Sequence, residues 1–236
     1  MNSKYSTFLT ILLVVIIIAI VGIIGFLGYK FISSENSKKQ AEDFADSWTE
    51  IKKDDKKDET SSTVTDTTID VTEPEITDST KTESTATSTS EKKYNNFLVA
   101  GTIEIPRTGY KGPIISFSEY SKSSLETAVC VVYSTTGEES TPGSGINKVG
   151  NTTIAGHNYR NGNFFSNNKK INVGDKIYIT DLDGKRMTYT VYNKYETEDT
   201  DADYMTRDTQ GAVEISLTTC TDDSKQRLII WAKADA

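Results

Sequence analysis

The hydrophobic and polar positions of the chain fall into three zones with different patterns. The first zone is an uninterrupted apolar run, FLTILLVVIIIAIVGIIGFL, which extends from Phe8 to Leu27. About twenty residues with a rise of about 1.5 Å each just span a hydrocarbon core about 30 Å thick. The run therefore predicts a transmembrane helix. It is followed by a polar zone, and then by a zone in which short apolar runs alternate with turn residues.

The apolar run predicts a signal anchor over residues 8–30, preceded by a short cytoplasmic tail of residues 1–7. No small-residue cleavage site follows the run, so we expect the anchor to be retained; a cleaved leader is the alternative interpretation. More lysines follow the run than precede it, and this count alone favours a cytoplasmic C-terminal part. We nevertheless expect the C-terminal part to be extracellular. The tail is short, acidic residues lie among the later lysines, and the next zone has the composition of an extracellular spacer.

Residues 31–93 form a polar zone that predicts a disordered, acidic linker. More than half of residues 60–90 are serine or threonine and none is aromatic, so this stretch has too little apolar surface to offset the entropy cost of ordering. The early part, residues 41–57, has apolar side chains at helical spacing. We interpret this part as a frayed juxtamembrane helix without a function.

The zone from Tyr94 to Ala236 has short β-branched and aromatic runs separated by turn residues, which is typical of an all-β domain. Eight such runs predict eight strands and therefore a barrel or a sandwich. One short helix is expected near Tyr120 to Thr127, and a turn near Asn163 to Asn168. The expected strands are Val99 to Ile105, Ile114 to Phe117, Ala128 to Tyr133, Asn151 to Ala155, Lys176 to Thr180, Met187 to Tyr195, Ala212 to Leu217 and Arg227 to Lys233.

The charge and the scarce residue types exclude several classes of protein. A net charge of -8 without a basic stripe argues against nucleic-acid binding, because neutralising phosphates requires a basic surface. Two cysteines cannot form a disulfide scaffold, and together with one histidine they cannot form a zinc site of the finger or ribbon kind. Most of the negative charge lies in the linker, so the acidity says little about the ligand of the folded domain.

Three side chains of the β domain are candidates for chemistry. His157, the only histidine, directly follows an apolar run and a glycine; its alternative interpretation is an ordinary surface histidine. Cys220 lies among threonines at the end of an expected strand, and Arg227 begins the next strand. Cys130 lies in the apolar run TAVCVVY and is expected to be a buried packing residue. A disulfide between Cys130 and Cys220 is the alternative for both cysteines.

A thiol, an imidazole and a guanidinium together can catalyse acyl transfer. A nearby cation stabilises the thiolate, which is the nucleophilic form, and a histidine can return a proton to a leaving amine. An arginine can hold the developing oxyanion or the backbone of a substrate. The order of the residues, with His157 before Cys220, excludes the papain arrangement.

The segments around these residues resemble the signature of sortases, the membrane-anchored cysteine transpeptidases of Gram-positive bacteria. The resemblance rests on IAGHN at 154–158, SLTTC at 216–220 and RLIIWAK at 227–233. It also includes the opening GTIEIPRTGYKGPII and the segment NVGDKIYITD. Ser216 stands where the family often has threonine, an exchange that keeps a hydroxyl.

The resemblance implies an eight-stranded sortase-type β-barrel with one or two short helices, in which Cys220, His157 and Arg227 meet at one groove. Cys220 would attack the Thr-Gly carbonyl of a Leu-Pro-x-Thr-Gly-like sorting signal and form a thioacyl intermediate. His157 would act as general acid and base, Arg227 would stabilise the oxyanion or bind the substrate, and Thr219 would line the same pocket. The implied partners are surface proteins that carry the signal and an amine acceptor, typically of a peptidoglycan precursor. No cofactor is implied.

Within the family the sequence favours class A or class D. It has no Asp-Pro-aromatic lid motif before the barrel, no second apolar segment after it, and too few residues between Tyr195 and Ala212 for the extra helix of class B. Carboxylate oxygens suit calcium, and some class A members bind this ion in an acidic loop. A similar acidic run occurs here, which we interpret as a solvated loop without a metal, with a calcium site as the alternative: Glu196, Glu198, Asp199, Asp201 and Asp203.

A non-catalytic alternative accounts for the same anchor, linker and strands. It is a β domain displayed on a Ser/Thr stalk that binds a ligand without chemistry. Only the constellation of His157, Cys220 and Arg227 separates the two hypotheses. On that constellation we expect a cysteine transpeptidase, a single-pass protein of the cell membrane with an extracellular catalytic domain.

Overall fold

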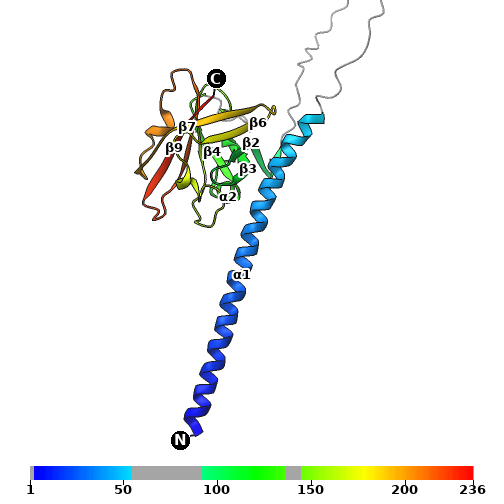
Figure 1. Ribbon diagram of the computed structural model, residues 1–236, viewed down its shortest axis with the longest axis vertical. Helices are drawn as coiled ribbons and strands as arrows, with labels where there is room; N and C mark the ends of the chain where they lie inside the picture. The colour runs from blue at the N-terminus through cyan, green and yellow to red at the C-terminus, as the bar shows by residue number, and fades with distance from the viewer. Residues whose placement is uncertain (1–2, 55–91, 137–144, 236) are drawn as a thin grey trace, which may run out of the picture.

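The computed structural model describes residues 3–54, 92–136 and 145–235, and it combines a long helix with a β-barrel (Figure 1). Helix α1, Ser3–Asp54, runs from the N-terminal end to the side of the barrel. The Ser/Thr-rich part of the expected linker, residues 55–91, lies outside the described residues. The sites described below lie in the barrel and in the part of α1 beside it.

Eight strands close the barrel, which confirms the all-β, eight-stranded fold. The strands follow one another in the order β2-β3-β4-β5-β8-β9-β7-β6, and β6 pairs with β2 to complete the ring. The pairs β3–β4 and β5–β8 are parallel, and the other pairs are antiparallel. The bounds are β1 Lys93–Tyr94 (an addition to the edge of β2), β2 Phe97–Ile105, β3 Tyr110–Ile115, β4 Val129–Ser134, β5 Gly150–Ala155, β6 Lys176–Asp181, β7 Arg186–Glu198, β8 Val213–Cys220 and β9 Gln226–Ala234.

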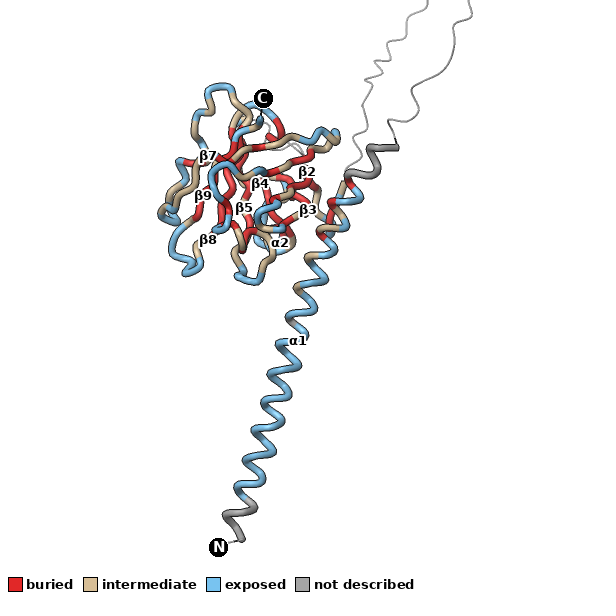
Figure 2. Tube along the Cα trace, viewed as in Figure 1, coloured by how far each residue is buried: buried red, intermediate tan, exposed pale blue. Residues whose placement is uncertain are grey.

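Isoleucine and valine side chains fill the barrel, because alternate residues of each strand point to the same face. Ile103, Ile154, Ile177 and Ile230 are each no more than 1% exposed. Figure 2 shows that the buried positions concentrate on the strands, with exposed positions in the connecting loops. Because the interior is a packed core, side chains that meet a substrate have to lie at the ends of the strands.

Several strands extend further than the sequence predicted, and the extensions of β7 and β8 affect the site. β8 continues to Cys220 because its antiparallel ladder with β9 runs as far as the Cys220↔Arg227 pair. β7 continues to Glu198 because it pairs with β9 over most of its length. Glu196 and Glu198 therefore lie on a strand and not in a loop.

Helix α2, Lys122–Thr127, confirms the short helix expected before β4. Its N-terminus is closed by a capping box: the Ser121 hydroxyl accepts from the Ser124 amide (3.2 Å), and the Ser124 hydroxyl accepts from the Ser121 amide (2.8 Å). This cap fixes the helix that carries Glu126 close to the site. The other short helices are η1 Phe117–Glu119, η2 Asn168–Lys170 and α3 Asp203–Thr206.

Residues 31–54, expected to begin the linker, continue α1 instead. The structure corrects the interpretation of a frayed helix, because one face of this segment packs on the barrel. Ala41, Ala45 and Trp48 are 7%, 0% and 2% exposed. The Trp48 indole donates a hydrogen bond to the Asp181 carbonyl at 3.2 Å. A short helix that frays alone is stabilised when its apolar face is buried in this way.

Aromatic and charged contacts add to this docking of α1. The Phe44 ring meets the Tyr94 ring edge to face, with centroids 5.1 Å apart. The Lys92 ammonium lies 4.1 Å from the centre of the Trp48 ring, and Lys111 of β3 forms an ion pair with Asp46. The juxtamembrane part of α1 is therefore an integral element of the folded domain.

The N-terminal part of α1 has a different environment. This part is long and apolar enough to cross a membrane, by length and composition. Its large apolar side chains over residues 8–27 are exposed. The helix thus divides into an exposed apolar segment and a segment that docks on the barrel (Figure 2).

Candidate active site

The pairing of β5, β8 and β9 brings the three candidate residues to one end of the barrel. β5 and β8 are parallel, with Ala155 paired to Thr218. His157 and Cys220 each lie two residues beyond this last pair. Cys220 is itself paired with Arg227 across β8 and β9. Residues that are far apart in the sequence therefore lie at the ends of three adjacent strands.

The Arg227 guanidinium contacts the Cys220 thiol directly. Its Nη1 donates a hydrogen bond to Cys220 Sγ at 2.9 Å, and both residues are half-buried. The guanidinium is thus a fixed cation directly beside the sulfur. Cys220 thus has the kind of neighbour that a nucleophilic cysteine requires.

His157 lies at the start of the loop of residues 156–167, called the His157 loop below. Its half-buried ring lies against the Tyr159 ring, with centroids 4.9 Å apart. Burial lowers the pKa of His157 below its ordinary value, and the Glu126 carboxylate opposes this shift. The imidazolium is therefore a minority form near neutral pH. A group that gains and loses a proton in this range suits acid and base catalysis.

We expect the pH profile of kcat/KM to reflect this environment. The acid limb should report the titration of His157 and lie below the ordinary histidine pKa of about 6.5. In Glu126→Gln the opposing negative charge is gone, so the pKa of His157 falls further and the acid limb moves to lower pH. Glu119→Gln, a matched change on a nearby element, should leave the limb in place. An upward shift in Glu126→Gln contradicts this assignment.

Gly156 allows the His157 loop to leave β5 close to the core. A Cβ atom at this position would lie 2.8 Å from the Phe165 ring and 2.8 Å from Val129 Cγ1. Both neighbours are fully buried and cannot give way. The glycine that the sequence places directly before His157 is therefore required by packing.

Asn158 is a candidate positioning residue that sequence reasoning missed. Its Nδ2 donates hydrogen bonds to the Cys220 carbonyl (3.0 Å) and to Asp222 Oδ1 (3.0 Å). Asp222 also forms an ion pair with Lys169. These contacts join the His157 loop to the end of β8, so they fix the imidazole relative to the thiol. The position of Asn158, directly after His157 in the segment IAGHN, was the only available signal.

Asn158→Ala should lower kcat/KM by about ten- to a hundredfold, because small displacements of catalytic groups have effects of this size. Most of the loss should appear in kcat, since the variant keeps every group that contacts the substrate. Thermal unfolding of the same variant separates local displacement from global destabilisation. Parental kinetics in Asn158→Ala would show that the two loops hold their positions without this bridge.

Thr219 and Cys220 line a small hollow of about 130 Å³, called the Cys220 hollow, together with Asn158, Phe165 and Leu228. Thr219 is 5% exposed, and its hydroxyl has no hydrogen-bond partner within the part of the chain that the structure describes. Buried hydroxyls normally have a partner, so this one is available to a substrate group. The role of Thr219 in substrate binding stays a prediction, with a placement that favours it.

Cys130 lies away from this site, in a second core cluster with Trp48 and Tyr94. It is fully buried, and burial raises its pKa to about 12, so the thiol stays protonated and unreactive. Both cysteines are free. The structure therefore confirms Cys130 as a packing residue and not as half of a disulfide with Cys220.

The acidic residues of the expected solvated loop are spread over two kinds of structure. Glu196 lies on β7 and lines the Cys220 hollow. Asp201 accepts hydrogen bonds from the Thr197 hydroxyl (2.6 Å) and the Asp203 amide (2.9 Å). Among the described residues, no three His, Cys, Asp or Glu side chains gather as a group that fits a metal ion. Calcium binding in this segment stays an alternative from the sequence alone.

Comparisons with known proteins identify the family in which this arrangement occurs. The family model described as the sortase domain matches residues 103–235, more than half of the chain. The chain belongs to the sortase family. A comparison with curated protein sequences finds no match.

Solved sortase structures resemble this sortase in fold. Sortase C-1 from Actinomyces oris is 20% identical and has a TM-score of 0.50. The match covers 58% of this chain and 72% of the other chain. Sortase C1 from Streptococcus agalactiae is 22% identical (TM-score 0.49, 58% and 68% covered). Sortase D5 from Clostridium perfringens is 26% identical (TM-score 0.47, 58% and 79% covered). These comparisons do not resolve the class of this chain, and the similar structures point more to class C than to the expected class A or D.

The family match covers part of the functional region of this sortase. It contains His157, Cys220 and Arg227, but it begins after β1 and leaves out α1. The residues with which α1 contacts the barrel therefore lie outside the region that the family model matches.

Proposed function

We propose that this sortase cleaves a Leu-Pro-x-Thr-Gly-like sorting signal between threonine and glycine and transfers the acyl group to an amine. The observation that carries the proposal is the 2.9 Å contact between Arg227 Nη1 and Cys220 Sγ. It is supported by the start of the His157 loop directly after β5, the strand that pairs with β8. These three groups supply the nucleophile, the proton carrier and the cation that thioacyl transfer requires.

In the first half-reaction the Cys220 thiolate attacks the carbonyl carbon of the threonine. Arg227 carries several N–H donors in one plane, so one can bind the developing oxyanion while another remains beside the sulfur. The C–N bond then breaks as the His157 imidazolium donates its proton to the departing glycine amine. The products are a thioester on Cys220, a neutral imidazole and a free C-terminal fragment.

In the second half-reaction a neutral amine attacks the thioester carbon. The neutral His157 accepts a proton from the attacking nitrogen, the C–S bond breaks, and the sulfur leaves as a thiolate beside Arg227. An amide bond has formed, and the pair of thiolate and imidazolium is restored. These steps involve no metal and no cofactor.

The proposed partners are surface proteins with a C-terminal sorting signal and an amine acceptor of the cell wall of a Gram-positive bacterium. We further propose that residues 8–27 of α1 anchor the protein as a single-pass membrane protein with the barrel outside the cell. This placement is supported by the exposed apolar side chains of that segment and by the extracellular location of the proposed substrates. Protease treatment of intact cells tests it: digestion of the barrel is expected, and full protection contradicts it.

For the class we propose A or D. The only proline before the barrel, Pro74, follows a glutamate, so the Asp-Pro-aromatic lid motif is missing from this sequence. Between β7 and β8 the chain forms only the four-residue helix α3 in place of the long helix typical of class B.

Turnover of a quenched Leu-Pro-x-Thr-Gly peptide in the presence of an amine tests the proposed function. The parent protein should cleave the peptide and form the amide product. Cys220→Ala should lose at least about a thousandfold in turnover, because no other group supplies the nucleophile. Cys130→Ala, which removes the buried thiol, should retain the activity. Equal turnover by Cys220→Ala and the parent would instead favour a β domain that binds a ligand without chemistry.

A further inference from the structure

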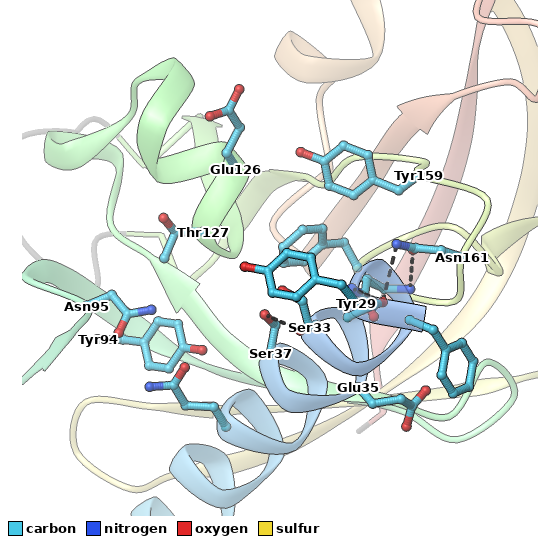
Figure 3. Close-up of a pocket in the computed structure, with 15 residues that line it drawn as sticks. Tyr29, Ser33, Glu35, Ser37, Tyr94, Asn95, Glu126, Thr127, Tyr159 and Asn161 are labelled. Atoms are coloured by element: carbon cyan, nitrogen blue, oxygen red, sulfur yellow. Dashed lines mark hydrogen bonds between the residues drawn. The ribbon is translucent and has the colours of Figure 1, made fainter. Parts of the chain in front are cut away.

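A larger pocket lies between α1 and the His157 loop and has no role in the steps above. Its volume is about 990 Å³, and α1 forms one wall between Tyr29 and Gln40 (Figure 3). We call it the helix-side pocket. Ser34 Oγ accepts hydrogen bonds from Asn163 Nδ2 (3.0 Å) and Asn161 Nδ2 (3.4 Å), which fasten α1 to the His157 loop. The pocket is therefore built from two elements that are held together, one of them outside the region that the family model matches.

The lining of the helix-side pocket has the chemistry of a site for a positively charged group. The rings of Tyr29, Tyr94 and Tyr159 contribute aromatic surface, and Glu35 and Glu126 contribute two carboxylates. The described lining residues include no lysine and no arginine. Carboxylates attract an ammonium group by charge, and aromatic faces attract it through their quadrupoles. An anionic ligand, in contrast, has no cationic partner in this lining.

The helix-side pocket adjoins His157 and not Cys220. The Tyr159 ring that forms part of its wall lies against the imidazole. The Glu126 carboxylate acts on both groups: it opposes the lowering of the His157 pKa by burial, and it adds to the raising of the Tyr159 pKa by burial. In Figure 3 the Tyr159 hydroxyl points to the side on which Glu126 lies. Lys122 is 4.0 Å from Glu126, but its side chain is 90% exposed and does not line the pocket. Cys220 opens instead into its own hollow.

We propose that the helix-side pocket holds the ammonium group of the amine acceptor before the second half-reaction; the inference rests on the proposed transfer to an amine. The acyl group is on Cys220, so the amine has to arrive from the side of the base that deprotonates it. There the bound ammonium releases one proton to water and becomes a neutral amine. Its nitrogen then attacks the thioester carbon, the second proton passes to His157, and the thiolate departs.

Comparison of a charged and an uncharged nucleophile tests the proposal with the full chain in lipid nanodiscs. Triglycine carries an α-ammonium group at neutral pH, whereas hydroxylamine is uncharged. In Glu35→Gln/Glu126→Gln, kcat/KM for triglycine relative to hydroxylamine should fall about five- to tenfold, through a higher KM for triglycine. Any change in the basicity of His157 acts on both nucleophiles and so largely cancels in this ratio. The matched control, Asp43→Asn/Glu119→Gln, removes two carboxylates outside the pocket and should keep the parental ratio.

The outcomes separate this inference from the proposed function. If the parent protein does not cleave the peptide, the proposed function fails and the inference fails with it. If the parent cleaves and the ratio is unchanged in the double variant, the pocket does not hold the acceptor while the sortase function stands. The double variant could instead raise the KM for the sorting-signal peptide and leave the ratio of kcat/KM for triglycine and hydroxylamine unchanged. This result would assign the pocket to the acyl donor, the sorting-signal peptide, and would also overturn the inference.

Discussion

Arg227→Lys is expected to lower kcat/KM for the sorting-signal peptide by about a hundredfold or more, the usual cost of removing a donor to a developing oxyanion. The guanidinium has to contact Cys220 Sγ, now at 2.9 Å from Nη1, and the oxyanion at the same time. A planar fork does this with separate N–H groups, whereas a lysine ammonium is a single point of charge on a flexible chain. Because Arg227→Lys retains the positive charge, the loss in kcat/KM reports the contribution of the guanidinium geometry and not of the charge.

The measurement is steady-state cleavage of the quenched peptide, together with detection of the thioacyl enzyme by mass spectrometry. Arg160→Lys is the matched control, because it makes the same exchange at an exposed position of the His157 loop. It should retain nearly the parental rate. Near-parental turnover by Arg227→Lys would show that a positive charge suffices, and it would refute the proposed double role of the guanidinium.

Trp48→Ala is expected to lower the free energy of unfolding of the folded domain by about 3 kcal/mol, as found for other buried aromatic side chains. Trp48 is 2% exposed between α1 and the barrel, and its indole donates to the Asp181 carbonyl. Removing it leaves a cavity and takes away one of the two hydrogen bonds that the Asp181 carbonyl accepts, the other coming from the Gly184 amide. It also weakens the docking of the whole juxtamembrane segment.

Denaturant unfolding of the full chain in detergent micelles measures this effect. The second tryptophan of the chain, Trp231 on β9, remains as a fluorescence reporter of the barrel. Ser47→Ala changes an exposed neighbour on the same helix and should leave the midpoint unchanged. If Trp48→Ala unfolds at the parental midpoint, α1 contributes nothing to the stability of the barrel, contrary to the packing described above.

The strands of the barrel were predictable because they depend on local patterns. Runs such as Val99 to Ile105 alternate β-branched and small residues between turn signals, and this pattern favours a strand whatever its neighbours are. The ends were less predictable, because a ladder ends where its partner strand ends. β8 reaches Cys220 and β7 reaches Glu198 only because β9 pairs with both. One consequence is that part of the expected acidic loop is strand.

The candidate catalytic residues were predictable from scarcity and from their segments. The chain has one histidine, and only one of its cysteines lies outside an apolar run, so His157 and Cys220 were the only candidates of their types. The resemblance to the sortase signature, which includes RLIIWAK, added Arg227. The role of Asn158 was not predictable, because its partner, the Cys220 carbonyl, is 62 residues away in the chain. A contact of that kind exists only after β5 and β8 have paired.

The sequence by itself determined an apolar segment long enough to span a membrane, an all-β domain of eight strands and a single candidate nucleophile, because each depends on composition or on short-range pattern. Only the tertiary structure decided that residues 31–54 form a helix docked on the barrel, since Ala45 and Trp48 stabilise it by packing on a distant surface. The helix-side pocket depends on the same docking, because α1 supplies one of its walls. Burial and strand register act between residues that are distant in the chain, and no local pattern of side chains records which surfaces will meet.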